Sequence, residues 1–347
     1  MENEIFLLAL AILSVCLLWW GFKALPGERW QIMATIPVRK IDSDRWDGLN
    51  LTYYGLFSAN AYLMSMAILF VFFGAIKIDI KTTFAIVTIM LAICIPMARI
   101  VVIVVEKKAH TRTVGGAVFV GIVLAPLAIL AVNKIMGSGE AIPVMPAMAA
   151  LAISYSLGEG FGRLACISFG CFYGRALSEC FPLMQRLFRY NNFIFSGKTK
   201  KIAYESGLDG ERVFPVQAIT SGLFTATGLF CTYLFLNGYD AASFLFSVLV
   251  TQGWRALSEI LRADYRGEGR ISVYQIMGIV AIMYSFILWN WSDDSNITAN
   301  IMEGIHTVWQ PEVIIFLLLF WPGIFLHTGC SKVTGSIISF HVHKDRI

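Results

Sequence analysis

Nine stretches of about twenty mostly apolar residues constrain what this chain can fold into. A helix needs about 20 apolar residues to cross the hydrocarbon core of a bilayer. Only 14% of the 347 residues are charged and 57% are hydrophobic, whereas soluble domains carry roughly 25% charged residues. The sequence therefore predicts an all-α, polytopic membrane helix bundle of about nine transmembrane helices, placed approximately at residues 4–22, 53–75, 83–105, 114–133, 147–165, 215–237, 243–261, 272–290 and 312–330.

The segments outside these stretches narrow the class further. The first stretch follows the acidic start Met-Glu-Asn-Glu, and because a secretory signal starts with basic residues, we expect a retained helix. The seven cysteines lack the spacing of a disulfide or zinc framework. We expect no metal, no other cofactor and no nucleic-acid partner. The longest polar stretch, residues 175–213, is long enough to form a small lid or head at the membrane surface.

Basic residues fall almost entirely on one side of the predicted bundle. Of the 24 Lys and Arg residues outside the spans, 21 lie on the side that holds residues 23–50, 106–113, 175–213, 262–270 and the tail, here called side A. Because basic loops are concentrated in the cytoplasm, side A is predicted to be cytoplasmic. A basic rim around an anion site would produce the same bias. We interpret the basic tail, residues 341–347, as a membrane-surface anchor.

Three arginines lie within or at the ends of the apolar stretches: Arg99, Arg163 and Arg255. A charge at membrane depth costs at least ~2.5 kcal/mol and is usually paired or faces a polar cavity. Glu159 and Glu259 stand four residues from Arg163 and Arg255, so each pair would share a helix face. These pairs could be structural staples. Because all three arginines fall near side A, we favour a shared anion pocket, since Arg binds phosphate oxygens in a bidentate way.

Glycines surround one of these arginines. Residues 158–174 read GEGFGRLACISFGCFYG, a density of glycine that weakens a helix but allows close approach of helices or of a ligand. The Lys-Ser/Thr ending of a P-loop is missing. Gly115 and Gly116 open another predicted helix, where backbone amides could face an anion. Small-residue packing is the alternative interpretation of both segments.

The chain resembles the bacterial prolipoprotein diacylglyceryl transferases over roughly residues 50–290. Gly162-Arg163-Leu164 followed by Gly170 and Gly174 is similar to the signature G-R-x-G-N-F-x-N-G-E-x-x-G of that family. The stretch from Arg255 to Arg262 is similar to its R-x-x-x-E-x-x-R helix. Five further similarities keep the order of the family: Tyr53-Tyr54-Gly55-Leu56 (W-Y-G-L), Ala98-Arg99-Ile100 (G-A/G-R-I/L), Val114-Gly115-Gly116 (H-G-G), Phe214-Pro215-Val216-Gln217 (H-P-S/T-Q) and Ser272-Val273-Tyr274-Gln275 (M-G-Q).

The resemblance implies a seven-helix transferase core at residues 51–290, with an extra N-terminal helix and basic loop (1–50) and an extra C-terminal helix and tail (291–347). It implies a multi-pass enzyme of the bacterial inner membrane that moves a diacylglyceryl group from an anionic, phosphatidylglycerol-like phospholipid to a cysteine thiol of a lipoprotein precursor. The implied catalytic residues are Arg163, Arg255, Glu259 and Tyr54. The implied substrate-binding residues are Arg99, Gly115, Gly116, Glu159, Gly162, Gly170, Tyr173, Gln217, Arg262 and Gln275.

Several positions depart from the family pattern. The signature Asn and Glu of the family fall at Cys166 and Cys171, its H-G-G histidine falls at Val114, and a further glutamate falls at Thr220. The two cysteines could be nucleophiles, acylation sites or inert buried thiols. The proton acceptor stays open among Tyr54, Tyr173, Glu159 and His110. The family site faces outward, whereas the charge distribution places side A inside. Two alternatives therefore remain: a transferase with another acceptor, such as a cytoplasmic one, and a non-catalytic phospholipid- or partner-binding protein.

Overall fold

A computed structural model describes residues 1–106, 114–136, 141–264, 271–290 and 298–347. Most of these residues are helical. The helices are α1 (Glu2–Ala24), α2 (Tyr53–Ala75), α3 (Ile80–Glu106), α4 (Val114–Met136), α5 (Val144–Phe169), α6 (Pro182–Leu187), α7 (Lys201–Ser206), α8 (Val216–Leu236), α9 (Asp240–Leu261), α10 (Val273–Asn290), α11 (Ile301–Val308) and α12 (Pro311–Gly329). The strands are β1 (Ile32–Lys40), β2 (Arg45–Thr52), β3 (Phe193–Ile194), β4 (Arg212–Val213) and β5 (Cys330–Ser339).

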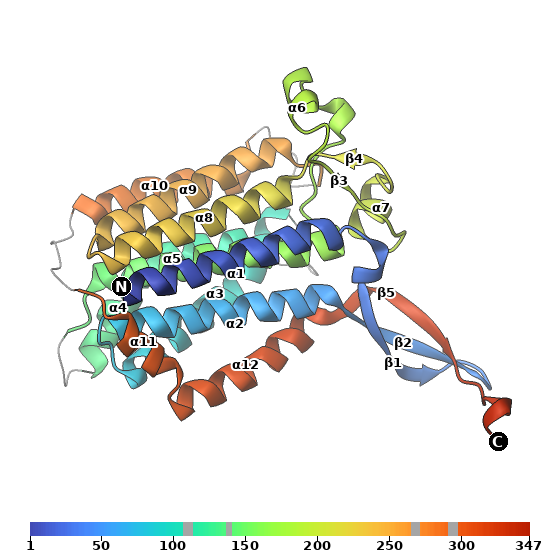
Figure 1. The fold of residues 1–347 in the computed structure, drawn as a ribbon, viewed down its shortest axis with the longest axis horizontal. Helices are drawn as coiled ribbons and strands as arrows, with labels where there is room; N and C mark the ends of the chain where they lie inside the picture. Colours follow the sequence, from blue (N-terminus) through green and yellow to red (C-terminus); the bar gives the residue numbers. More distant parts are fainter. Residues whose placement is uncertain (107–113, 137–140, 265–270, 291–297) are drawn as a thin grey trace.

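The long helices lie side by side as a bundle, which confirms the predicted polytopic helical membrane class (Figure 1). Each of the nine predicted spans falls on a long helix. Among the described residues, seven helices are long and apolar enough to cross a membrane: α1, α2, α3, α4, α8, α10 and α12. The remaining two, α5 and α9, are long enough but more polar, so the count of nine spans stays a prediction.

The polarity of α5 follows from its place in the bundle. This helix packs against α2, α8 and α9 and buries residues around its whole circumference. Gly158 and Gly160 let Ser65 of α2 and Thr225 of α8 approach its backbone closely. A helix that faces protein on all sides needs no apolar surface for lipid, so α5 can hold charged residues at membrane depth.

The polar segments gather at one end of the bundle. Strands β1 and β2, helices α6 and α7, strand β5 and the C-terminus lie at this end, while the N-terminus and α11 lie at the other (Figure 1). Residues 23–50, residues 175–213 and the tail, all assigned to side A, therefore share one end, as the alternation of predicted spans requires. Which compartment this end faces stays a prediction.

A three-stranded antiparallel sheet, in the order β1-β2-β5, joins the two ends of the chain. We expected a basic loop at residues 23–50 and did not predict this sheet. Asn50 is fully buried and accepts hydrogen bonds from Thr35 (2.9 Å) and Ser336 (2.6 Å). Thr52 donates to the carbonyl of Gly329 at 3.0 Å, so the start of α2 is tied to the end of α12. The predicted N-terminal segment (1–50) and C-terminal segment (291–347) are thus in contact with each other.

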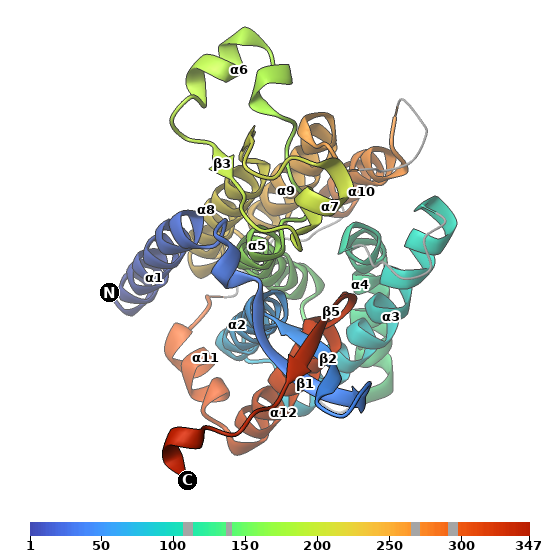
Figure 2. The ribbon, with the colours of Figure 1, turned by 90° about the vertical axis from the view of Figure 1, so that its right-hand side faces the viewer.

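Residues 175–213 form a small head at the same end, as Figure 2 shows from that side. Strands β3 and β4 pair within the head. Lys200 is fully buried, and its ammonium group donates to the carbonyls of Leu25 (3.2 Å) and Ser168 (2.7 Å). Burial lowers the pKa of Lys200 to about 8. This single side chain therefore connects the head to the ends of α1 and α5.

Candidate functional site

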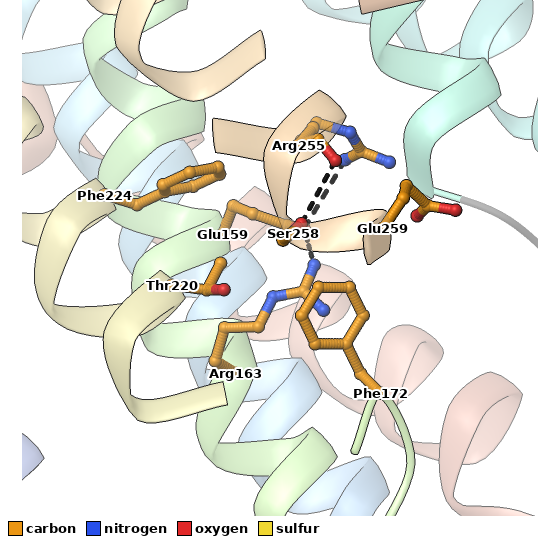
Figure 3. A pocket seen from close by; sticks show the side chains of 8 residues that line it. All are labelled: Glu159, Arg163, Phe172, Thr220, Phe224, Arg255, Ser258 and Glu259. Carbon is orange, nitrogen blue, oxygen red and sulfur yellow. Dashed lines mark hydrogen bonds and ion pairs between the residues drawn. The ribbon is translucent and has the colours of Figure 1, made fainter. Parts of the chain in front are cut away.

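A small pocket lies where the side-A halves of α5, α8 and α9 meet. Its lining combines two arginines and two carboxylates with aromatic and hydroxyl side chains (Figure 3). The enclosed space is about 10 Å³, roughly the room of one water molecule. The lining residues are Glu159, Arg163, Phe172, Thr220, Phe224, Arg255, Ser258 and Glu259.

Glu159 is the centre of the pocket. Its carboxylate forms an ion pair with Arg163, one turn further along α5, and lies 3.8 Å from the guanidinium of Arg255 on α9 (Figure 3). The expected Glu159–Arg163 pair is thus confirmed. Two cations from different helices share one carboxylate, at the place where an anionic ligand would find both of them.

The prediction that Arg255 pairs with Glu259 on its own helix is wrong. The carboxylate of Glu259 accepts from Arg262 at 3.0 Å, and Asp264 accepts from the Nε of Arg262 at 2.7 Å. Glu259 therefore holds the buried Arg262, and the Arg255 guanidinium is within ion-pair distance of Glu159 instead. The reason is tertiary: α5 brings Glu159 alongside α9, a contact that spacing within one helix cannot reveal.

Phe172 supports two of these guanidiniums. Its ring centroid lies 4.2 Å from the guanidinium carbon of Arg163 and 3.8 Å from that of Arg262. Such cation–π contacts favour a fixed orientation of each planar cation. Phe172 has a φ of 57°, an uncommon conformation for a bulky residue and one that concentrates at functional sites.

Three buried polar atoms of the pocket lining have no hydrogen-bond partner among the described residues: Oε1 of Glu159, which is within ion-pair distance of both arginines, Nε of Arg163 and Oε2 of Glu259. Leaving a buried donor or acceptor unsatisfied costs about 1–3 kcal/mol. The Arg163 nitrogen can donate to an anion, and the Glu259 oxygen can accept from a hydroxyl or amine. The pocket therefore presents complementary positions for a ligand that carries both an anionic oxygen and a hydroxyl group.

Gly115 leaves room for the Arg255 side chain to reach the pocket. A Cβ atom at position 115 would overlap the Nη2 atom of Arg255 and lie 3.1 Å from its Cζ atom. At Gly116 a Cβ would meet Val101 of α3 instead. The first glycine thus admits a site side chain, whereas the second serves the packing of α3 against α4, the alternative interpretation given above.

The end of α5 brings the two departing signature positions together. Gly170 has a φ of 72°, and the amide of Cys171 donates to the carbonyl of Cys166 at 3.0 Å. This helix-ending geometry brings the side chains of Cys166 and Cys171 within hydrogen-bond reach of each other. Arg163 lies 3.6 Å from the sulfur of Cys166, and Gln217 donates to the Cys171 carbonyl at 3.0 Å. These residues border the pocket and shape its loop without lining it.

Other predicted site residues lie away from the pocket. Arg99 is exposed on α3, so the structure places two of the three arginines in the pocket. The Tyr173 hydroxyl lies 2.8 Å from Glu205 in the head. Gln275 donates to the carbonyl of Ala256 at 2.9 Å and ties α10 to α9. His110 lies outside the described residues.

Two further predicted residues are near the pocket but not in its lining. Tyr54 packs its ring against Phe169 with centroids 5.5 Å apart. Gly162 has open space around it, with only Ala61 near at 3.9 Å. Sequence reasoning missed three lining residues: Phe172, Phe224 and Ser258. Phe172 stands inside the glycine-rich stretch and Ser258 inside the stretch from Arg255 to Arg262, which are their only signals, and nothing in the sequence marks Phe224.

Comparison with known proteins agrees with this arrangement. The sequence matches the family described as prolipoprotein diacylglyceryl transferase over residues 45–291. No curated protein matches the sequence. The matched region contains seven long helices, α2, α3, α4, α5, α8, α9 and α10, together with every residue that lines the pocket, and leaves α1 and α12 outside. The chain is therefore a multi-pass membrane protein that belongs to the prolipoprotein diacylglyceryl transferase family.

Proposed function

We propose that this protein transfers the diacylglyceryl group of an anionic, phosphatidylglycerol-like phospholipid to a cysteine thiol of a lipoprotein precursor in the bacterial cytoplasmic membrane. The observation that carries the proposal is the convergence of Arg163 and Arg255 on one carboxylate, that of Glu159, in a pocket at the end of the bundle. A phosphodiester is the anion that two guanidiniums at membrane depth fit best.

The two arginines supply the electrostatic part of the reaction. The acceptor thiol loses its proton as its sulfur attacks the carbon of the diacylglyceryl group that bears the phosphate ester. The carbon–oxygen bond breaks with its electron pair on the phosphate oxygen, so that a thioether forms, glycerol phosphate leaves, and the thiol proton is taken up by the glycerol phosphate or by water. Negative charge grows on the departing phosphate, next to Arg163 and Arg255. Removing one such fixed donor typically lowers kcat by 10²–10³, or about 2.7–4 kcal/mol.

The open polar atoms match the headgroup of the proposed donor. The unpartnered Nε of Arg163 would receive a phosphate oxygen, and the unpartnered Oε2 of Glu259 would accept from a headgroup hydroxyl. Because the enclosed space holds about one water, binding requires the ring of Phe172 or Phe224 to move. Glu159 would turn away from the arginines as the phosphate replaces its carboxylate.

Release of glycerol phosphate tests the proposal. The full chain is reconstituted in phosphatidylglycerol nanodiscs with a cysteine-containing acceptor peptide. Arg163→Ala and Arg255→Ala should each lower release at least about 100-fold, while Arg39→Ala, which removes an exposed arginine of β1, should retain the wild-type rate. Full activity in either pocket variant would contradict the assignment of Arg163 and Arg255 to the phosphate of the donor lipid. Retained lipid binding without turnover in the wild type would favour a non-catalytic lipid-binding role.

A second candidate keeps the donor site and changes the acceptor. Cys166 and Cys171 stand where the family has Asn and Glu, and basic residues crowd side A, which favours a cytoplasmic acceptor. A single reporter cysteine at the exposed position Glu211, in a chain without other cysteines, distinguishes a lipoprotein-precursor acceptor from a cytoplasmic acceptor. Labelling by an impermeant thiol reagent on intact cells supports a lipoprotein precursor on the outer face. Protection until the cells are opened supports a cytoplasmic acceptor.

A further inference from the structure

A short arm projects from the head, away from the pocket. We define the α6 arm as residues 180–190, which read CFPLMQRLFRY. Four of its large apolar side chains are well exposed: Phe181 (76%), Leu183 (67%), Leu187 (63%) and Tyr190 (85%). Exposed apolar groups on this scale, gathered on one short segment, mark an interaction surface.

The arm is an ordered structure rather than a loose loop. Gln185 donates to the carbonyls of Ser178 (3.0 Å) and Cys180 (2.8 Å), which closes the turn before α6. The ring of Phe188 packs edge-on against Phe214, with centroids 4.7 Å apart. The contact of Phe188 with Phe214 thus fixes the arm, while Phe181, Leu183, Leu187 and Tyr190 stay exposed.

The position of the arm indicates what it faces. In Figures 1 and 2, α6 lies at the level of the side-A helix ends and projects outward beyond α8, α9 and α10. The side-A end of α10 also exposes apolar residues, Val273 and Ile276. α10 is one of the helices apolar enough to span a membrane. A bilayer around the bundle would therefore extend beneath the arm.

The chemistry of the arm fits a bilayer surface. Arg186 and Arg189 are exposed beside the apolar residues, and no acidic residue occurs between positions 180 and 190. The Arg189 guanidinium lies 5.5 Å from the centre of the Tyr190 ring. Aromatic and leucine side chains beside arginines are typical of segments that lie in the headgroup layer. Two arginines add attraction to anionic headgroups.

We propose that the α6 arm docks on the bilayer surface, with Phe181, Leu183, Leu187 and Tyr190 in the boundary between headgroups and acyl chains and Arg186 and Arg189 on anionic lipid headgroups. The arm would fix the head, and the end of α5 that the head contacts, at a set height above the membrane. This role is independent of the transferase reaction proposed above and of which compartment side A faces.

Limited trypsin cleavage of the full chain in nanodiscs tests the docking. Trypsin cuts after Arg186 and Arg189 in the arm, and after Lys198 and Arg212 in the same head, which are exposed and serve as internal controls. In nanodiscs with anionic phospholipid, cleavage in the arm should be at least about tenfold slower than in zwitterionic nanodiscs. Cleavage at the two control sites should be the same in both lipids.

A double variant, Leu183→Glu with Leu187→Glu, should abolish the protection in the arm and leave the control sites unchanged. Equal cleavage of the wild-type arm in the two lipids would overturn the proposal, and this comparison needs no variant. Protection that arises only when a protein partner is added would also overturn it, because the surface would then belong to that protein.

Discussion

Gly115→Ala is the substitution that most sharply tests the geometry of the pocket. The added methyl group would overlap the Nη2 atom of Arg255, and its 3.1 Å distance to Cζ is tighter than an ordinary contact. A shift of a few tenths of an ångström cannot relieve this overlap, so the flexible end of Arg255 must move, and we expect this movement to disturb its 3.8 Å contact with Glu159. The variant should therefore lose most of what Arg255 contributes.

The expected loss is about 100-fold in glycerol phosphate release, the lower end of the range for one transition-state donor, or about 2.7 kcal/mol. Gly222→Ala is the matched control, because Gly222 lies in α8 and a Cβ there meets nothing within 4 Å. That control should keep its activity, and its helix should gain up to about 1 kcal/mol of stability from the better helix former.

A double-mutant cycle decides the mechanism of this loss. If Gly115→Ala acts by displacing Arg255, it should have little further effect in an Arg255→Ala background, since the group it displaces is already absent. Rates would be measured for both single variants and the double variant in the same phosphatidylglycerol nanodiscs. Multiplicative losses in the double variant would refute the reasoning, because the methyl group would then act elsewhere.

Three further predictions concern neighbouring parts of the structure. Burial lowers the pKa of Lys200 to about 8 from its usual 10.5. Between these pH values the unfolded chain binds more protons than the folded chain, so the free energy of unfolding rises with pH, by up to about 3 kcal/mol. The Tm difference between wild type and Lys200→Met, measured at pH 7.5 and 10.5, should show this rise, and a constant difference would contradict it. Asn50→Leu removes the acceptor of the half-buried Thr35 and Ser336 hydroxyls, at a cost of about 1 kcal/mol, and should speed trypsin cleavage after the exposed Lys332 of β5. Cys166→Asn keeps an acceptor for Arg163 and should retain release, whereas Cys166→Val should lower it about fivefold, equivalent to about 1 kcal/mol.

Features that depend on neighbours along one helix could be predicted from the sequence. The apolar stretches located the long helices, because the bilayer sets their length and polarity. Glu159 and Arg163 are one turn apart on α5, and their pair follows from helical spacing alone. Gly158 and Gly160 let Ser65 and Thr225 come close to the helix backbone, which is the close approach of helices predicted for the glycine-rich stretch.

Features that depend on helix rotation or distant pairing could not be predicted. Arg99 has the same kind of apolar surroundings as Arg163, yet the rotation of α3 leaves it exposed. Arg255 lies near Glu159 because α5 and α9 are adjacent, which no spacing within α9 indicates. Strand β2 pairs with β5 across nearly the whole length of the chain, so neither segment carries a local signal of its partner. The basic residues of 23–50 suggested only a loop.

Mass spectrometry of the acceptor peptide is the most direct test of the central claim, that Arg163 and Arg255 hold a phospholipid for transfer to a thiol. The peptide is incubated with the full chain in phosphatidylglycerol nanodiscs and analysed for a diacylglyceryl thioether on its cysteine. We predict the modified peptide with wild type and with Arg39→Ala, and none with Arg163→Ala or Arg255→Ala. An unmodified peptide with wild type, or equal modification by the pocket variants, would contradict the account.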